Sequence, residues 1–149
     1  MRRLILGLMI VILSAASVPA WAESDPIYTS WRNNKAVGGY DVVSFFSGKP
    51  IIGNDALTET YMGAVWYFST QANRDLFKTN PEAFAPQYGG YCAWAIAKNK
   101  LARGSAKHWH VEDGKLYLNF NKKIKKRWDK DRAEFIIQAD GYWPEILED

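Results

Sequence analysis

The sequence has very little cysteine, since its 149 residues contain only Cys92. One thiol cannot close an internal disulfide, and it cannot supply the paired cysteines of a dithiol redox centre. Histidine is also scarce, with two residues in the whole chain. No phosphate-binding loop, dinucleotide fingerprint, zinc-finger spacing or Gly-x-Ser-x-Gly motif occurs. The common nucleotide-binding and hydrolase classes therefore have no support in the sequence.

Long apolar runs are absent except at the N-terminus. There, Met1-Arg2-Arg3 gives a positive start, Leu4 to Val18 is mostly apolar, and Ala20-Trp21-Ala22 supplies small residues at the two positions that a signal peptidase reads. This layout predicts a secretory signal peptide over residues 1–22, cleaved after Ala22, and hence a periplasmic protein. The apolar stretch is shorter than the roughly 20 residues of a membrane-spanning helix. We therefore expect no transmembrane anchor after cleavage.

A strong net charge is also missing. The formal charge is +3, and it falls by two when Arg2 and Arg3 leave with the signal peptide. A near-neutral domain gives no support for bulk nucleic-acid binding. Lysine and arginine do cluster between residues 122 and 132. We interpret this cluster as the solvated side of an amphipathic helix, because the helix lacks the broad apolar face that membrane insertion requires.

Aromatic residues are abundant, with seven Trp, eight Tyr and seven Phe. Because each buries a large area, a mature chain of about 127 residues can build one core without disulfides. We expect residues 23–35 to be a polar lead-in, fastened to the body by Ile27, Tyr28 and Trp31. Residues 36–149 are expected to form one domain, with no internal repeat.

Turn residues and hydrophobic periodicity predict an α+β fold, a single small domain with two antiparallel hairpins, several short helices and a helical C-terminus. Asp41 is placed to cap the first short helix, and Asp113-Gly114 suits a two-residue hairpin turn. The expected hairpins pair Leu57–Tyr61 with Ala64–Phe68 and Trp109–Glu112 with Lys115–Asn119. The expected helices cover residues 42–46, 71–78, 91–98 and 122–140, the last with a break near Asp131. We expect Ser69 or Thr70 to cap the second of these helices, with Leu76 and Phe77 pointing inward.

Several short motifs follow one another in a fixed order: Gly39-Tyr40-Asp41, Phe45-Phe46, Gly63, Trp66-Tyr67-Phe68-Ser69, Asn73-Arg74, Phe77, Pro81, Phe84, the block from Pro86 to Ala93, the block from Asp113 to Asn119, Trp128 and Trp143-Pro144. This ordered set, from about Ala36 to Pro144, resembles the YHS-domain family. Its members are small domains found alone in exported bacterial proteins and fused to some metal-transporting pumps. The resemblance implies the fold and suggests metal handling. The family name refers to Tyr-His-Ser, however, and Phe68 replaces that histidine, so its metal role cannot be carried over.

Cys92 is the first candidate site residue. It follows Gly89-Gly90 and precedes a predicted helix, a position where a thiolate can be stabilised. Such a thiolate binds a soft metal such as Cu(I) or exchanges with another thiol. The alternative interpretation is a small, buried, apolar residue, since free cysteines often pack in this way.

His108 and His110 are the second candidate site. They lie two apart in a predicted strand, on the face opposite Trp109 and Val111, which we expect to look toward solvent. Two imidazoles at this spacing can hold a divalent ion if a third ligand is present. Copper and zinc are thus the metal ions to consider, and ordinary surface histidines are the alternative.

The sequence favours an exported, non-enzymatic YHS-type binding domain that binds copper or another soft metal through Cys92. The alternative is a module that binds a small molecule or a protein partner without metal, in a pocket lined by aromatic residues: Trp66, Tyr67, Tyr88, Tyr91 and Trp94. A thiol-dependent redox enzyme is a third possibility, disfavoured because no resolving cysteine exists.

Overall fold

A computed structural model of the chain describes residues 23–149, and the predicted signal peptide lies outside this range. The fold is a small α+β domain, as predicted, with two antiparallel two-stranded sheets. Its α-helices and strands are β1 (Asn54–Tyr61), β2 (Ala64–Phe68), α1 (Gln71–Thr79), α2 (Ala93–Ile96), β3 (Ser105–Glu112), β4 (Lys115–Asn119), α3 (Lys122–Trp128) and α4 (Arg132–Tyr142). Short 3₁₀ helices cover Val37–Gly39, Val42–Ser47, Pro81–Ala83, Gln87–Gly90 and Glu145–Glu148.

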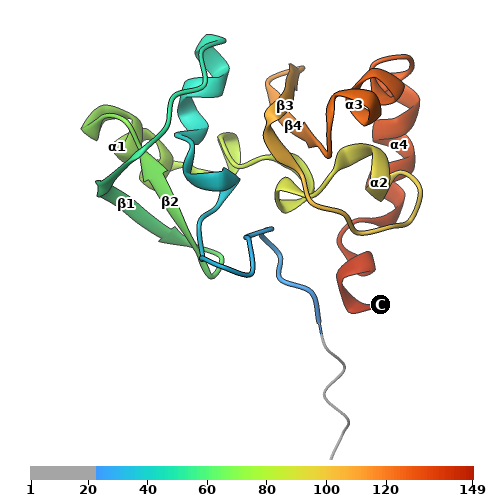
Figure 1. Cartoon of the computed structure of the whole chain (residues 1–149), viewed down its shortest axis with the longest axis horizontal. Helices are drawn as coiled ribbons and strands as arrows, with labels where there is room; N and C mark the ends of the chain where they lie inside the picture. Colours follow the sequence, from blue (N-terminus) through green and yellow to red (C-terminus); the bar gives the residue numbers. More distant parts are fainter. Residues whose placement is uncertain (1–22) are drawn as a thin grey trace, which may run out of the picture.

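The elements form two lobes (Figure 1). The first lobe holds β1, β2 and α1, and the second holds β3, β4 and helices α2 to α4. The lead-in is fastened mainly to the second lobe: the Ser24 amide donates to the Leu147 carbonyl, and the Tyr28 amide donates to the Gly89 carbonyl. Ile27 is buried as expected, whereas Trp31 is 88% exposed and does not anchor the segment. No helix within residues 23–149 has the length and apolar character needed to cross a bilayer.

The two lobes are copies of one backbone plan, related by a shift of 51 positions along the chain. Each copy opens with three consecutive left-handed residues. Their φ angles are 52°, 62° and 84° from Val37 to Gly39, and 57°, 59° and 86° from Tyr88 to Gly90. The residue after this turn then forms an isolated antiparallel β-bridge in each copy, Tyr40 with Ile52 and Tyr91 with Arg103. Two glycines suit this turn because they adopt positive φ without a steric penalty.

The hairpins repeat with the same shift. β1 and β3 have equal lengths and the same irregularity in register, and both hairpins turn through a left-handed pair, Met62-Gly63 and Asp113-Gly114. The helices that follow are capped at equivalent positions, by the Thr70 hydroxyl and by the Asn121 side-chain carbonyl. We therefore correct our expectation that the chain has no internal repeat.

Few side chains reveal this repeat in the sequence. The residues that are identical in the two copies are Gly38/Gly89, Gly39/Gly90, Tyr40/Tyr91, Lys49/Lys100, Gly53/Gly104, Gly63/Gly114, Phe84/Phe135 and Gln87/Gln138. Half of these pairs are glycines, and the glycines lie where the backbone turns left-handed or approaches another segment closely. A side chain on Gly53 would meet the Tyr67 backbone, and one on Gly104 would meet the Gly90 carbonyl. The backbone plan has thus been kept while most side chains have changed.

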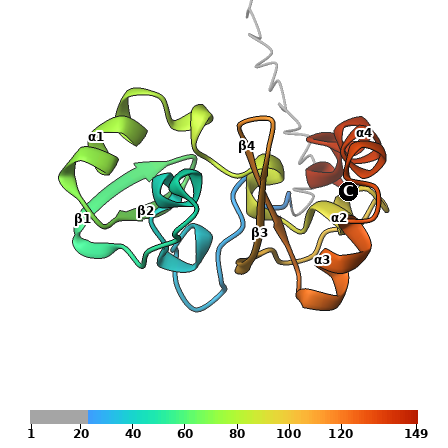
Figure 2. The same cartoon turned by 90° about the horizontal axis from the view of Figure 1, so that it is seen from above.

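The core consists of two clusters with the β3–β4 hairpin between them (Figure 2). One face of the hairpin presents Leu116 and Leu118 to the first lobe, where Trp109 also meets the Phe45 ring edge-on at 5.5 Å. The other face presents Tyr117 to Trp128, with ring centroids 5.3 Å apart. Both faces are therefore covered by other elements.

This arrangement overturns the expectation that the histidine-bearing face looks toward solvent. Tyr117 and Asn119 on that face are 3% and 0% exposed, because the C-terminal helices cover it. Burial accordingly raises the pKa of Tyr117 to about 12, with a further contribution from the negative charge of Asp140. The predicted hairpin register is confirmed from Glu112–Lys115 to Trp109–Leu118. Beyond that point Asn119 pairs with Ser105 rather than His108, because the register shifts there.

The predicted helices are largely confirmed. Asp41 caps Val42–Ser47, and a break at Asp131 separates α3 from α4. Two details were wrong. Leu76 was expected to point inward but is 51% exposed, whereas its neighbour Phe77 is buried. The helix expected over residues 91–98 is confined to α2, because Tyr91 and Cys92 keep extended backbone to pair with neighbouring segments.

The repeated close approaches predict matched effects of two glycine substitutions. Gly53→Ala and Gly104→Ala should each lower the free energy of unfolding by about 1 to 3 kcal/mol, because the added methyl group overpacks a backbone contact. Gly141→Ala is the control, since a methyl group at this position in α4 meets no atom within 4 Å. It should be stabilising by about 0.5 to 1 kcal/mol. Urea denaturation of the three variants checks this, and a neutral Gly104→Ala would contradict the packing.

Candidate functional site

The equivalent positions of the two lobes differ most in their buried polar groups. In the first lobe Asp41 is fully buried, and its carboxylate accepts four hydrogen bonds. They come from the Val43 amide at 3.0 Å, the Ser69 amide and hydroxyl at 2.8 and 2.6 Å, and the Asn73 side-chain amide at 2.8 Å. Nearby, the Ser44 hydroxyl accepts from the Ile51 amide at 2.9 Å. A fully satisfied polar network therefore fills this position.

In the second lobe the same frame carries an apolar set of residues. The residues 51 positions later are Cys92 in place of Asp41, Ala95 in place of Ser44, Phe120 in place of Ser69 and Ile124 in place of Asn73. The backbone geometry is retained: the Asp41 amide donates to the Ile51 carbonyl at 2.8 Å, and the Cys92 amide donates to the Ala102 carbonyl at 2.9 Å. The network of the first lobe is thus absent from the equivalent place in residues 92–124.

A cavity of about 280 Å³ lies at this place. All four replacement residues are part of its wall, and Trp94, Lys98, Lys100, Leu101 and Ala102 complete the lining. Lys98 lies with its ammonium group 4.9 Å from the centre of the Phe135 ring, and the Arg127 guanidinium lies 5.6 Å from the Trp94 ring. The cavity therefore combines an apolar interior with cationic groups around the aromatic residue at its edge.

The Cys92 thiol is 1% exposed to solvent and forms part of this wall. Burial raises its pKa above the ordinary value of 9.0, against the opposing effect of hydrogen bonds from the backbone amides of Ala95, Phe120 and Trp94. The thiol is therefore protonated at neutral pH, since desolvation disfavours the charged form. The expected thiolate at a helix start is not the ground state of this residue.

Asn119 supports the Cys92 loop from β4. Its side-chain oxygen accepts from the Trp94 amide at 3.1 Å and lies 3.6 Å from the Cys92 sulfur. This bond replaces the one that the Asp41 carboxylate receives from Val43 in the first lobe. No group within residues 23–149 accepts a hydrogen bond from the Asn119 side-chain nitrogen, although the residue is fully buried. An unpaired buried amide is costly, so the two bonds to the Asn119 oxygen are made at the expense of its nitrogen.

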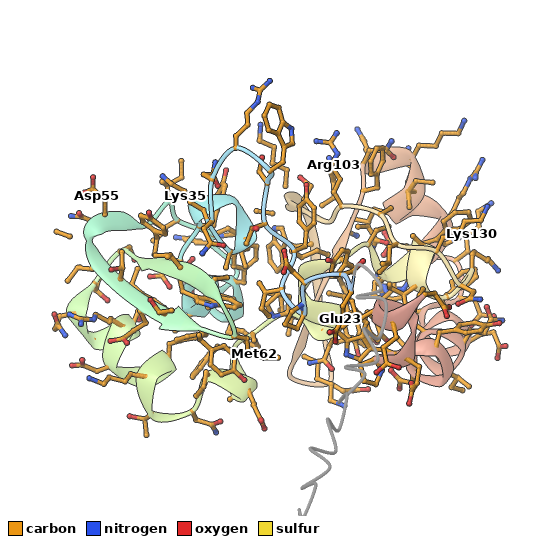
Figure 3. The ribbon with its side chains drawn as sticks, turned by 90° about the horizontal axis from the view of Figure 1, so that it is seen from below. Glu23, Lys35, Asp55, Met62, Arg103 and Lys130 are labelled. Atoms are coloured by element: carbon orange, nitrogen blue, oxygen red, sulfur yellow. The ribbon has the colours of Figure 1, made fainter. Side chains whose placement is uncertain are left out.

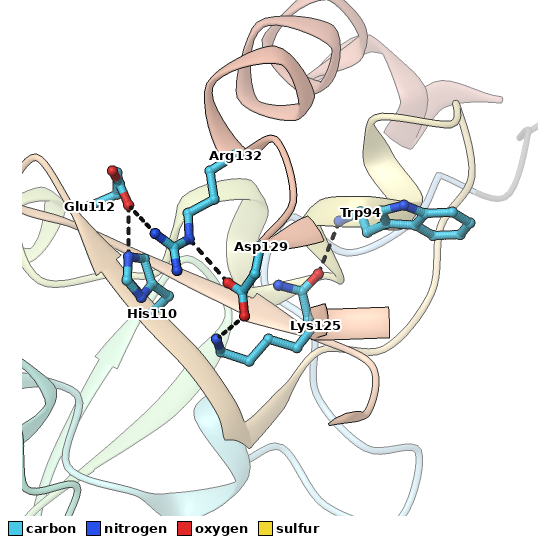
Figure 4. A network of polar contacts seen from close by, with 7 residues as sticks. Trp94, His110, Glu112, Lys125, Asp129 and Arg132 are labelled. Atoms are coloured by element: carbon cyan, nitrogen blue, oxygen red, sulfur yellow. Dashed lines mark hydrogen bonds and ion pairs between the residues drawn. The ribbon is translucent and has the colours of Figure 1, made fainter. Parts of the chain in front are cut away.

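The histidines do not join Cys92. His110 Nε2 lies 2.6 Å from the Glu112 carboxylate, which also accepts a hydrogen bond from the Arg132 guanidinium at 3.4 Å (Figure 4). The same chain of ion pairs continues through Asp129 to Lys125. Arg132 and Lys125 already pair with both carboxylates of this network, so neither carboxylate is free of a cation to help His110 hold a metal ion. Across residues 23–149, no three His, Cys, Asp or Glu side chains gather closely enough to hold a metal ion.

The five aromatic residues expected to line one pocket fall into separate clusters. Trp66 packs against Phe77 in the first lobe, with ring centroids 4.8 Å apart, and the Tyr67 ring lies 4.6 Å from the Lys35 ammonium. Tyr88 and Tyr91 are buried in the second core cluster, where Tyr88 donates to the Asp140 carboxylate at 2.8 Å. Trp94 is the member of the set that lines the Cys92 cavity.

Comparison with known proteins does not identify a relative. No family model, no curated protein and no solved structure matches the chain. The resemblance to the YHS-domain family therefore remains a prediction, based on the motifs in the sequence.

Sequence reasoning found Cys92 and Trp94 but missed the other residues around the cavity. Ala95, Ala102, Phe120 and Ile124 carry no reactive group, and only their joint position makes them a wall. The available signal was the repeated Gly-Gly-Tyr turn at residues 38–40 and 89–91. It would have aligned the two halves and exposed the replacement of Asp41 by Cys92.

The burial of Cys92 predicts slow and strongly pH-dependent alkylation. Iodoacetamide reacts with the thiolate, so the rate should be well below that of a free thiol at pH 7 and should keep rising above pH 9. Intact-mass spectrometry measures this directly, because the chain has one cysteine. The same protein unfolded in urea is the control and should react at the ordinary rate. An alkylation rate that no longer increases above pH 7 would contradict the raised pKa of the buried thiol.

Proposed function

We propose that this chain is an exported, non-enzymatic binding domain that takes a small organic molecule in the Cys92 cavity. The ligand has an apolar body and an anionic end. The observation that carries this proposal is the comparison of the two lobes: one backbone frame holds a packed polar network around Asp41 and an open apolar cavity around Cys92. The sequence motifs of an exported YHS-type protein are consistent with such a role.

The volume of the cavity is compatible with a ligand. A space of about 280 Å³ is near the lower end of typical ligand pockets, so it suits a compact molecule. Filling it would remove the exposed faces of Leu101, Phe120 and Ile124 from water, which is favourable in proportion to the area covered.

Charge at the cavity supports an anionic end on the ligand. Lys98 and Lys100 line the cavity, and none of its lining residues within 23–149 carries a carboxylate. The Lys98 ammonium already lies near two aromatic rings, at 4.9 Å from Phe135 and 6.0 Å from Trp94, so it is partly ordered before a ligand binds. A carboxylate or sulfonate at the rim would gain charge-assisted hydrogen bonds from these side chains.

A soft metal is less well supported. Cys92 would be one ligand for Cu(I), but the cavity wall contains no histidine, methionine or carboxylate to supply a second. The thiol is also protonated at neutral pH, and it would have to lose that proton to bind a metal. We therefore take the thiol as a polarizable part of the wall.

Octanoate and 1-octanol are suitable probes, because they share an apolar chain and differ in charge. The purified protein should bind octanoate saturably, with a change in tryptophan fluorescence from Trp94, and should bind octanol more weakly. Ala102→Ile should reduce octanoate affinity at least tenfold, since it introduces into the cavity the side chain found at the equivalent position of the first lobe, Ile51. Isothermal titration calorimetry measures both affinities.

Two further variants separate the charge from the cavity. Lys98→Gln should weaken the affinity for octanoate several-fold and leave the affinity for octanol unchanged. Lys78→Gln, an exposed lysine on α1, is the control and should affect neither probe. Absence of saturable binding of either probe, or equal affinities in the protein and in Ala102→Ile, would refute the proposal.

Export makes a separate prediction about the mature chain. The protein recovered from the producing cell should begin at Glu23, because cleavage is expected after Ala22. N-terminal sequencing or the intact mass checks this. Replacing Ala22 with a bulky residue such as Trp should block cleavage at this site, whereas a mature protein that still begins at Met1 would show that the segment is not a signal peptide.

A further inference from the structure

A second cavity, of about 260 Å³, lies between the N-terminal loop and the segment that leads into β3. It is distinct from the Cys92 cavity, because the adjacent residues Ala102 and Arg103 line different spaces. Within residues 23–149, its charged lining residues are Lys35, Arg103 and Lys107, and none of its lining residues is acidic. We call this space the inter-lobe cleft. Three residues with cationic side chains around one small cavity attract an anion.

Two of the cations are ordered by aromatic rings. The Lys35 ammonium lies 4.6 Å from the centre of the Tyr67 ring, and the Arg103 guanidinium lies 4.8 Å from that of Phe120. Lys35, the last residue of the lead-in, is bridged to Val65 in β2 of the first lobe, whereas Arg103 is bridged to Tyr91 in the second lobe. Figure 3 labels the two residues on these two sides of the molecule. Stacking of this kind limits the motion of the charged groups and leaves them able to donate hydrogen bonds.

Uncharged polar groups complete the cleft. Ser30, Asn33 and Ser105 line it, together with the backbone of Gly104. A side chain on Gly104 would collide with the Gly90 carbonyl, so this part of the wall is formed by bare backbone. Hydroxyl, amide and guanidinium donors around a small volume are the groups that bind oxyanions.

We propose that the inter-lobe cleft binds a small anion that carries two or more negative charges, of the phosphate or polycarboxylate class. Arg103 supplies a planar pair of donors, and Lys35 and Lys107 supply point charges from the two sides. The small volume excludes a polymer, so the ligand is a free small molecule or the terminal group of one. The cleft and the Cys92 cavity share no lining residue, although Arg103 of the cleft stacks on Phe120 of the cavity. The proposal does not depend on the function assigned to the Cys92 cavity.

Pyrophosphate and citrate are the probes that test the cleft. In 50 mM salt the purified protein should bind at least one of them saturably, with amide chemical-shift changes centred on Lys35 and on residues 103–107. The double variant Arg103→Gln/Lys107→Gln should weaken binding at least tenfold. The probe that binds more tightly identifies the class, since a bidentate guanidinium favours phosphate oxygens and a wider spread of cations favours citrate.

The matched control is Lys49→Gln/Lys115→Gln, which removes the same charge from exposed positions outside the cleft. It should leave the dissociation constant within twofold. Equal loss in both double variants would show that only the general charge of the protein attracts anions, and absence of saturable binding would also overturn the proposal. Ala102→Ile should retain anion binding, so failure of this proposal and failure of the Cys92 cavity proposal are distinguishable. Far-UV circular dichroism checks that each variant is folded.

Discussion

Three consecutive left-handed residues, followed by an extended tyrosine, set the course of the backbone in each lobe. This turn brings the next residue, Asp41 or Cys92, onto a segment whose amide donates to the carbonyl of Ile51 or Ala102, and the residue is buried in both lobes. Glycine meets the requirement for positive φ at little cost, and close approaches at Gly53 and Gly104 tighten the same frame. The hairpins, the helix caps and the buried site all depend on this constraint.

The buried position has diverged while its frame has not. In the first lobe the carboxylate of Asp41 gathers four donors and stabilises the junction between Val42–Ser47, β2 and α1. In the second lobe Asn119 takes over the bond to the backbone, and the remaining polar partners are replaced by apolar side chains. The second lobe thus keeps the backbone hydrogen bond of the frame, and the apolar replacements form the wall of the cavity.

The sequence predicted local structure well. The hairpin turn at Asp113-Gly114, the caps at Asp41 and Thr70 and the helix break at Asp131 all follow from short-range chemistry, and all are present. Exposure was predicted less well. The face that carries His110 was assigned to solvent because it is polar, yet α3 and α4 cover it. Alternation in a strand indicates which residues share a face, but it does not indicate what packs against that face.

The site shows the same division between local and tertiary information. The sequence by itself determined that one thiol is present, that it follows a glycine turn, and that an internal disulfide and an internal dithiol centre are excluded, because these properties depend on residue identity and near neighbours. Only the tertiary structure decided that Cys92 has Asn119 and an apolar wall as its partners, and that His110 belongs to an ion-pair network elsewhere. These relations join residues far apart in the chain, and the packing of β4, α2 and α3 brings them together.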